Sequence, residues 1–240
     1  MTYKLFANIY DKLMYDFDYE KVYSFIDKVY SASKLKNKTV LELGCGTGNL
    51  TEKLIKKFTV DAVDISLDML SILSSKISSS NLRVFNHDMV DFKSDRLYSM
   101  VLSCCDSVNY IRSSKDIKKL FKNTFNQLED EGIFIFDLNT EDKFISMENT
   151  YVDEVDDVFY VWENFYDVEN KENTYSINFF VRKNNLYERF YEEHIEKVYS
   201  NKFIVDTLKS VGFKSIEVYS EYEFGMEINN SNRLVYIARR

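Results

Sequence analysis

Three of the six glycines in this 240-residue chain fall within five residues, in the run Gly44-Cys45-Gly46-Thr47-Gly48. The run follows the apolar segment 39–43 and precedes apolar residues at helical spacing. A glycine-rich turn at the start of a helix lets a ligand approach free backbone N–H groups. Asp64 ends the next apolar segment, where a carboxylate can accept both hydroxyls of a ribose. The sequence therefore predicts a site for a nucleoside-containing ligand.

Glu42, two residues before Gly44, narrows the choice of that ligand. The glycine spacing is Gly-x-Gly-x-Gly, whereas a dinucleotide site has Gly-x-Gly-x-x-Gly. A carboxylate is unfavourable beside a pyrophosphate and favourable beside an ammonium group. These residues favour S-adenosylmethionine, which carries an amino-acid end and a sulfonium in place of phosphates. A nicotinamide-dependent oxidoreductase is the alternative that the spacing and Glu42 oppose.

The segments that must position these residues alternate between strand and helix patterns up to residue 140. Five strands, separated by helices, predict right-handed crossovers and a parallel sheet. The expected strands are 39–43, 59–63, 82–85, 97–102 and 133–136, and the expected helices are 19–32, 49–58, 67–79 and 115–128.

The pattern changes after Asn139. Residues 157–197 are rich in aromatic residues and alternate apolar with polar positions, which predicts an antiparallel meander of about three strands. A helix over 202–211 and two strands, 214–222 and 233–238, complete the chain. We therefore expect an α/β core made of residues 1–140 and 198–240. Residues 141–197 form an inserted antiparallel β segment that covers the substrate.

Composition excludes several classes of protein. The chain is 45% hydrophobic and 29% charged, as in a globular protein, and it has no run of about 20 apolar residues that could span a membrane. The start of the chain, Met1 to Phe6, has no signal-peptide pattern, so we expect a cytoplasmic protein, a monomer or a dimer. Two histidines and three cysteines, without a Cys-x-x-Cys pair, give no metal site and no disulfide framework.

Charge is distributed unevenly along the chain. The formal net charge is -8, and residues 141–200 alone hold 15 acidic and 6 basic residues. Nucleic-acid phosphates require lysine and arginine, so we expect no nucleic-acid partner. The acidic segment favours a small acceptor that is cationic or amine-bearing over an anionic one. Glu163, Glu192 and Glu193 are the carboxylates to test, because they lie near aromatic residues that could form an apolar wall. They either attract such an acceptor or form a solvated outer face.

Four segments also resemble a known family. Val40-Leu41-Glu42-Leu43-Gly44-Cys45-Gly46-Thr47-Gly48 resembles the first motif of class I S-adenosylmethionine-dependent methyltransferases. Val60 to Ser66 with Met69, His87-Asp88-Met89 and Ser103 to Ser107 resemble the second, third and fourth motifs. The N-terminal Tyr3-x-x-Phe6-Ala7-x-Ile9-Tyr10-Asp11 is similar to the opening of small bacterial methyltransferases of the YqeM type and related clostridial proteins.

The resemblance implies a fold and a set of cofactor contacts. The family fold is a Rossmann-like seven-stranded sheet of order 3-2-1-4-5-7-6, with strand 7 antiparallel. The resemblance implies that Gly44, Cys45, Gly46 and Gly48 form the cofactor loop, and that Glu42 and Cys104 border the methionine end. It implies that Asp64 binds the ribose. It also implies that Ile65 and Met69 flank the adenine, whose edge contacts Asp88 and Met89.

The implied reaction is methyl transfer to a small-molecule acceptor. It mainly requires that the reacting atoms are aligned and water is excluded. An amine needs no strong base, whereas a hydroxyl does. The sequence shows no dedicated base, so N-methylation is favoured over O-methylation. Candidates for orienting the acceptor are Tyr10, Asp106, Asn109, Tyr110 and His194. A non-catalytic protein that binds or senses S-adenosylmethionine is the second alternative.

Overall fold

A seven-stranded, mostly parallel sheet forms the centre of the molecule in the computed structural model, which describes residues 3–240. Met1 and Thr2, which open the N-terminal run considered above, lie outside it, as does the side chain of Tyr3. The strands are β1 (Thr39–Leu43), β2 (Thr59–Asp64), β3 (Leu82–Asn86), β4 (Tyr98–Ser103), β5 (Leu128–Asn139), β10 (Ser215–Ser220) and β11 (Arg233–Arg239).

The strand order is β3-β2-β1-β4-β5-β11-β10. β1 to β5 are parallel, and β11 pairs antiparallel with both β5 and β10. This confirms the predicted order 3-2-1-4-5-7-6 with an antiparallel strand 7. The expected fold class follows from the buried strands, which read as continuous apolar runs because helices cover both faces of the sheet.

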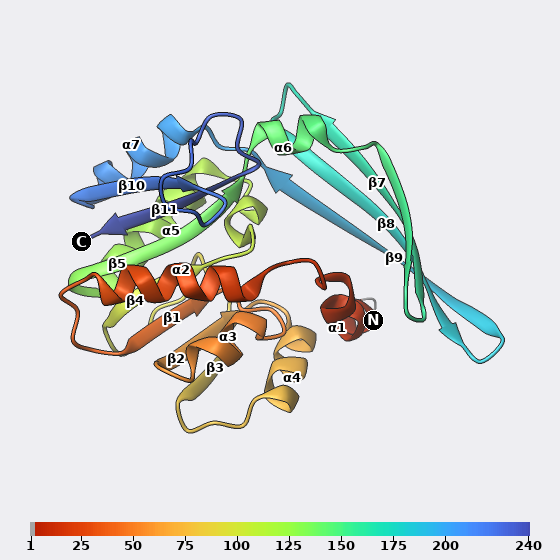
Figure 1. Cartoon of the computed structure of the whole chain (residues 1–240), viewed down its shortest axis with the longest axis horizontal. Coiled ribbons are helices and arrows are strands. Elements are labelled where there is room, and N and C mark those ends of the chain that lie inside the picture. Colours follow the sequence, from red (N-terminus) through yellow and green to blue (C-terminus); the bar gives the residue numbers. More distant parts are fainter. Residues whose placement is uncertain (1–2) are drawn as a thin grey trace.

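Helices on the two faces of the sheet build two apolar clusters. On one face α2 (Tyr19–Ser31), α3 (Asn49–Leu54) and α4 (Leu67–Lys76) contribute Phe25, Leu54 and Leu73. On the other face α5 (Ser114–Gln127) and α7 (Asn201–Val211) contribute Phe121 and Leu208. Figure 1 shows these layers, with α5 and α7 on the side away from α2 and α3. No helix in residues 3–240 is long and apolar enough to cross a bilayer.

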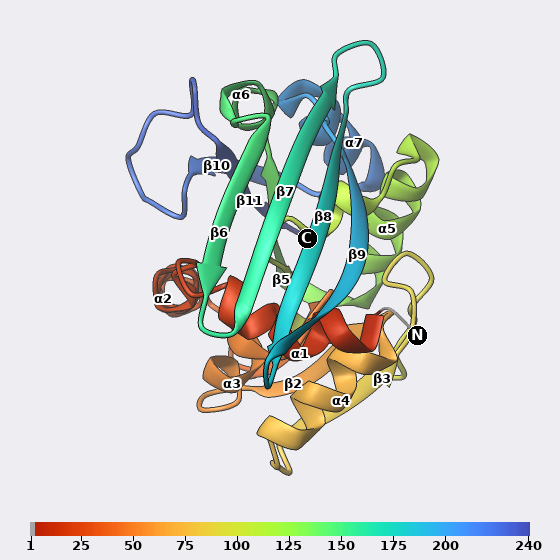
Figure 2. The same cartoon turned by 90° about the vertical axis from the view of Figure 1, so that its right-hand side faces the viewer.

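A second, antiparallel sheet leans over one end of the core. It has four strands: β6 (Thr150–Val155), β7 (Val158–Asp167), β8 (Glu172–Lys183) and β9 (Leu186–Lys197). Figure 2 shows these four strands side by side in front of the core. The expectation of about three strands is wrong: β6 is an exposed edge strand whose apolar residues, Tyr151, Val152 and Val155, do not alternate with polar ones, so it leaves no strand period in the sequence. The short helix α6 (Glu141–Ser146) precedes it.

Some element boundaries also differ from expectation. α3 ends at Leu54, and a turn continues to Phe58, whose N–H donates to the Leu54 carbonyl. α4 ends at Lys76, where Ile77 becomes extended. β5 is twelve residues long because its early part pairs with Tyr98 across a register shift.

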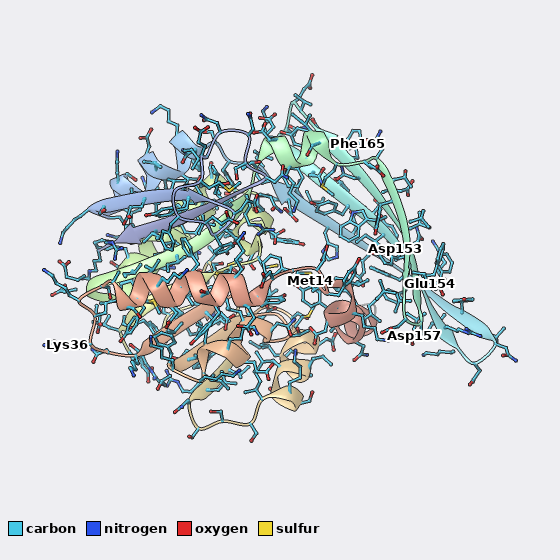
Figure 3. All side chains as sticks on the ribbon, in the orientation of Figure 1. Met14, Lys36, Asp153, Glu154, Asp157 and Phe165 are labelled. Atoms are coloured by element: carbon cyan, nitrogen blue, oxygen red, sulfur yellow. The ribbon has the colours of Figure 1, made fainter. Side chains whose placement is uncertain are left out.

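The N-terminal helix α1 (Tyr3–Leu13) lies between the core and the second sheet (Figures 1 and 2). Its Phe6, Ile9 and Leu13 pack against apolar residues of β7 and β8. Lys12 forms an ion pair with Asp157 in the β6–β7 turn, which lies beside α1 in Figure 3. The outer side of the sheet faces away from α1, and its Phe165 is 69% exposed.

Candidate functional site

The glycine turn between β1 and α3 has the shape of a ligand cradle. Gly44 has φ +73°, and a Cβ there would lie 2.6 Å from Ser107 Oγ, so close packing requires glycine. Gly46 has φ +54°, and nothing lies within 4 Å of where its Cβ would stand. The space beside Gly46 is therefore open, and only its backbone conformation and a ligand limit the side chain there.

Asp64 ends β2 beside this turn. Its Oδ2 accepts the Gly46 N–H at 2.8 Å, and its Oδ1 accepts the Ser66 N–H at 2.8 Å. Burial raises the pKa of Asp64, and these backbone hydrogen bonds oppose that rise. Two fixed donors hold the carboxylate in one orientation, and the remaining lone pairs are available to a ligand.

Glu42, on β1, is a buried residue beside the same turn. The residue is 3% exposed, and its Oε2 accepts a hydrogen bond from Thr51 Oγ1 at 2.6 Å. Burial raises the pKa of Glu42 to about 8. A cavity adjoins it, bordered by the glycine turn, the end of β4 and the α1–α2 region; its walls include Tyr10, Phe17, Tyr19, Gly44, Cys104 and Cys105.

Apolar and polar groups lie beyond Asp64 at the edge of the sheet. Ile65 is 72% exposed, which is unusual for an isoleucine, and Met69 and Met89 are half-buried. The Asp88 carboxylate accepts the Val90 N–H at 2.8 Å and is exposed. An exposed isoleucine next to an exposed carboxylate offers both an apolar surface and an acceptor to a ligand.

Known proteins match the whole chain. A family model described as a methyltransferase domain matches residues 40–132. YqeM of Bacillus subtilis (strain 168), which is named as a methyltransferase, is 31% identical to this chain. The match covers all of this chain and 98% of YqeM. The chain belongs to the YqeM-type methyltransferases. This membership decides against both the oxidoreductase and the non-catalytic alternative.

Solved structures agree with this assignment. An S-adenosylmethionine-dependent methyltransferase from Clostridium acetobutylicum ATCC 824 has a TM-score of 0.89 and 37% identity, covering 99% of this chain and 98% of that one. CalS10 from Micromonospora echinaspora, an amino pentose methyltransferase with S-adenosylmethionine bound, has a TM-score of 0.79 over 98% and 96% of the two chains. At 13% identity, CalS10 shares the fold.

S-adenosylmethionine is therefore the cofactor of this methyltransferase, and the residues present fit it. The open space at Gly46, the oriented carboxylate of Asp64 and the exposed Ile65 form a continuous edge along the ends of β1 and β2. The cavity beside Glu42 offers a carboxyl group to an amino-acid end. When bound, the cofactor supplies an electrophilic methyl group with a neutral leaving group.

The three cysteines near this site line it as thiols. Cys45 and Cys104 are buried, and Cys105 is half-buried. Burial raises the pKa of all three thiols, so they stay protonated at neutral pH. They act as small side chains in the wall of the cavity and not as nucleophiles.

Asp11, at the end of α1, connects that helix to the glycine turn. Its Oδ1 accepts hydrogen bonds from Thr47 Oγ1 at 2.5 Å and from Asn49 Nδ2 at 2.9 Å, and its Oδ2 pairs with Lys76 Nζ at 2.8 Å. The sequence alone does not identify this role of Asp11, which stands out there only as part of the N-terminal run. Its position after Tyr10 was the one available signal.

Three of the acceptor candidates and Phe6 form a chain of aromatic contacts. Phe6 lies 5.7 Å from Tyr10 and 5.2 Å from His194, centroid to centroid, and His194 lies 6.0 Å from Tyr110. We call Phe6, Tyr10, Tyr110 and His194 the aromatic cluster. Tyr10 also lines the cavity beside Glu42, so the cluster borders the cofactor site. Tyr110 is 46% exposed, so the cluster reaches solvent.

Asp106 places a carboxylate beside this cluster. Cys105 and Asp106 both have positive φ, 61° and 54°, at the turn after β4, and such strain is common at functional sites. Asp106 Oδ2 accepts from Asn139 Nδ2 at 2.6 Å, and Arg233 Nη1 lies 3.6 Å from Oδ1. Burial opposes ionisation of Asp106, but the charges of Arg233 and Lys143 hold its pKa below the ordinary value. Its side chain is 17% exposed.

Asn109 does not reach the surface of the site. It is fully buried, and its Nδ2 donates to the carbonyls of Asn139 and Lys197 at 3.2 and 3.0 Å. Its Oδ1 accepts the Asn139 N–H at 2.9 Å. The amide thus joins the short 3-10 helix Ser107–Tyr110 to β5 and β9, which makes it a positioning residue and leaves no group free for an acceptor.

The three glutamates of the acidic segment separate by face. Glu163 and Glu193 are exposed on the outer side of the second sheet, and Glu193 accepts a hydrogen bond from Tyr191 Oη at 3.0 Å. Glu192 is buried on the inner side. Adjacent residues of a strand point to opposite faces, so only one of the three carboxylates can face the site.

Proposed function

We propose that this methyltransferase methylates an amine nitrogen of a small molecule that binds at the aromatic cluster. The observation that carries the proposal is the ionised Asp106 carboxylate at the start of the 3-10 helix Ser107–Tyr110, where its charge, after burial, helps to raise the pKa of the Tyr10 phenol. A carboxylate together with aromatic faces attracts an ammonium group. CalS10, which shares this fold, is an amino pentose methyltransferase, so its acceptor carries an amine.

In this proposal the cofactor residues act along the ends of the strands. Asp64 accepts the ribose hydroxyls, Ile65 and Met69 flank the adenine, and Asp88 and Met89 meet its edge. The turn formed by Gly44, Cys45, Gly46 and Gly48 carries the amino-acid end, with Glu42 and Cys104 beside it. The open space at Gly46 and the exposure of Ile65 support this arrangement.

We further propose a cytoplasmic enzyme, a monomer or a dimer, that does not act on nucleic acid. Its net charge of -8 and the acidic segment 141–200 oppose phosphate binding. We also propose that residues 141–197 serve as the substrate cover over a cofactor-binding core of 1–140 and 198–240; α6 and β6 to β9 fall within that segment.

A screen of paired acceptors tests the amine. Formation of S-adenosylhomocysteine is measured with primary amines, amino sugars first, and with the matching alcohol in which hydroxyl replaces each amine. We expect turnover with at least one amine and none with its alcohol. Asp106→Asn, which keeps the shape and removes the charge, should raise KM for the amine about tenfold or more. Turnover of the alcohols alone would refute the proposed N-methylation.

A further inference from the structure

The inner face of the second sheet carries buried polar atoms that have no hydrogen-bond partner among the described residues. They are Trp162 Nε1, Asn164 Oδ1, Glu192 Oε1, His194 Nε2 and both side-chain polar atoms of Asn173. A buried polar atom without a partner is unfavourable and calls for an explanation such as a ligand or a reaction. Of this set, His194 is the one that belongs to the aromatic cluster.

His194 is held firmly by its neighbours. Its ring packs against Phe6 at 5.2 Å and meets Tyr110 edge to face at 6.0 Å and 87°. Tyr175 is its cross-strand partner on β8. These contacts fix the ring plane, so Nε2 keeps one direction while it makes no hydrogen bond within the described residues.

Several titratable groups surround the imidazole, and none is bonded to it. Tyr110 packs against it, Tyr175 lies opposite it on β8, and Tyr10 on α1 packs against Phe6; burial raises the pKa of the Tyr10 and Tyr175 phenols. On the same face of β9, Glu192 is buried, and Glu196 accepts a hydrogen bond from Asn139 Nδ2 at 2.9 Å. Burial lowers the pKa of His194, so its ring is neutral at pH 7. A neutral imidazole with its proton on Nδ1 has a free lone pair on Nε2.

We propose that His194 Nε2 accepts a proton from the bound ammonium group of the acceptor and so frees the nitrogen lone pair for methylation. This rests on the proposed function for the nature of the acceptor. As the N–C bond forms, the methyl C–S bond breaks and sulfur keeps the electron pair as a neutral thioether. Before this step, one ammonium proton passes to Nε2, and the imidazolium returns that proton to solvent as the product leaves. The methylated nitrogen keeps its positive charge and leaves as an ammonium group. The sequence suggested His194 only as an orienting residue, because its isolation inside the sheet is a tertiary feature.

Nuclear magnetic resonance can test this without knowledge of the acceptor, because the chain has only two histidines. His87 lies exposed on the loop after β3 and serves as the internal reference. The protein with labelled histidines is titrated with pH while saturated with S-adenosylhomocysteine, and again with sinefungin, in which CH–NH₃⁺ replaces the methylsulfonium.

An ammonium within about 8 Å, at an effective dielectric constant of about 20, lowers an imidazole pKa by roughly one unit or more. We therefore expect the His194 pKa to be lower by about one unit with sinefungin than with S-adenosylhomocysteine, while His87 is unchanged. Equal His194 pKa values in the two complexes would remove the residue from the reacting centre and overturn the proposal.

Kinetics with the most active amine of the acceptor screen test the proton transfer itself. His194→Gln and His194→Ala should lower kcat about 100-fold with little change in KM. Added imidazole should restore part of the activity of His194→Ala, which a purely structural loss would not allow. Glu193→Gln, one residue away on the outer face, is the matched control and should keep full activity.

An unchanged kcat in both His194 variants, or a change in KM alone, contradicts the proposal. If no amine is turned over, the proposed function fails, and the comparison of the two complexes by magnetic resonance still decides the position of His194.

Discussion

The buried carboxyl of Glu42 gives a sharp test of the cofactor site, because in the proposed arrangement its protonation changes when the ligand binds. With a pKa of about 8, roughly nine-tenths of the Glu42 carboxyls are protonated at pH 7 in the free protein. The ammonium of S-adenosylhomocysteine favours the carboxylate, so binding lowers this pKa and releases the proton. Affinity should therefore rise with pH up to about 8.

The free-energy cost of ionising Glu42 and the gain from its hydrogen bond to the ammonium nearly balance at neutral pH. Ionising Glu42 at pH 7 costs about 1.4 kcal/mol, and a charge-assisted hydrogen bond to the ammonium contributes about 1.5–3 kcal/mol. The net gain at pH 7 is therefore small, about 0.1–1.6 kcal/mol, and it approaches the full value above pH 8. Glu42→Gln should look almost harmless at pH 7 and clearly weaker at pH 8.5.

Isothermal titration calorimetry of S-adenosylhomocysteine measures both effects. The wild type should release about 0.9 proton per ligand at pH 7, seen as a dependence of the heat on the buffer, and Glu42→Gln should release fewer. The ratio of Kd values, Glu42→Gln over wild type, should rise about eightfold between pH 7 and 8.5.

Thr51→Val is the matched control for this experiment. It removes the hydroxyl that donates to Glu42 Oε2, and it should move the whole profile to higher pH because the carboxylate loses a donor. A Kd ratio that does not vary with pH, or a wild type that releases no proton at pH 7, would refute the reasoning that Glu42 meets the ammonium as a carboxylate.

Four further predictions concern other parts of the site. Asp64→Ala should weaken binding of S-adenosylhomocysteine by about 1.5–3 kcal/mol and should also lower thermal stability, because the Gly46 and Ser66 N–H groups lose their acceptor; unchanged titration would show that the ribose is held elsewhere. Gly46→Val should abolish binding, because valine at φ +54° is strained and fills the open space; a thermal shift with ligand equal to that of the wild type would contradict this. Asp11→Ala should speed amide hydrogen exchange in α1 and at residues 44–48, and exchange that matches the wild type would show that its three hydrogen bonds are dispensable. Glu163→Gln and Glu193→Gln should leave kcat/KM for a cationic acceptor unchanged in low salt, since both lie on the outer face; a clear drop would mean that this face steers the acceptor.

The order of the central sheet could be predicted because local signals agree there. Buried parallel strands and their helices have different periodicities, and the glycine turn marks where β1 meets α3. The edge strand β6 could not be predicted because residues on both of its faces are exposed, so its apolar residues do not alternate with polar ones. The strand count of the second sheet therefore came out too low.

Within the site, residue type was predictable and accessibility was not. Asn109 was predicted to help orient the acceptor. Its side-chain amide is instead used in hydrogen bonds with Asn139 and Lys197, which are far away in sequence. The pairing of Thr51 with Glu42 and the unpartnered nitrogen of His194 likewise depend on packing between distant segments. A sequence lists donors and acceptors, and only the fold decides which of them are already satisfied.

Two neighbouring residues of α1 contact different parts of the molecule. Asp11 accepts a hydrogen bond from Thr47 in the glycine turn, and Lys12 forms an ion pair with Asp157 in the second sheet. A rigid helix with both attachments links the energetics of the two ligands that bind on either side of it. Thermodynamic linkage then requires reciprocity. If an acceptor that draws α1 against the second sheet raises the affinity for the methyl donor by some factor, the bound donor must raise the affinity for the acceptor by the same factor. In the proposed arrangement, we therefore expect the N-terminal helix to couple the binding of the two substrates.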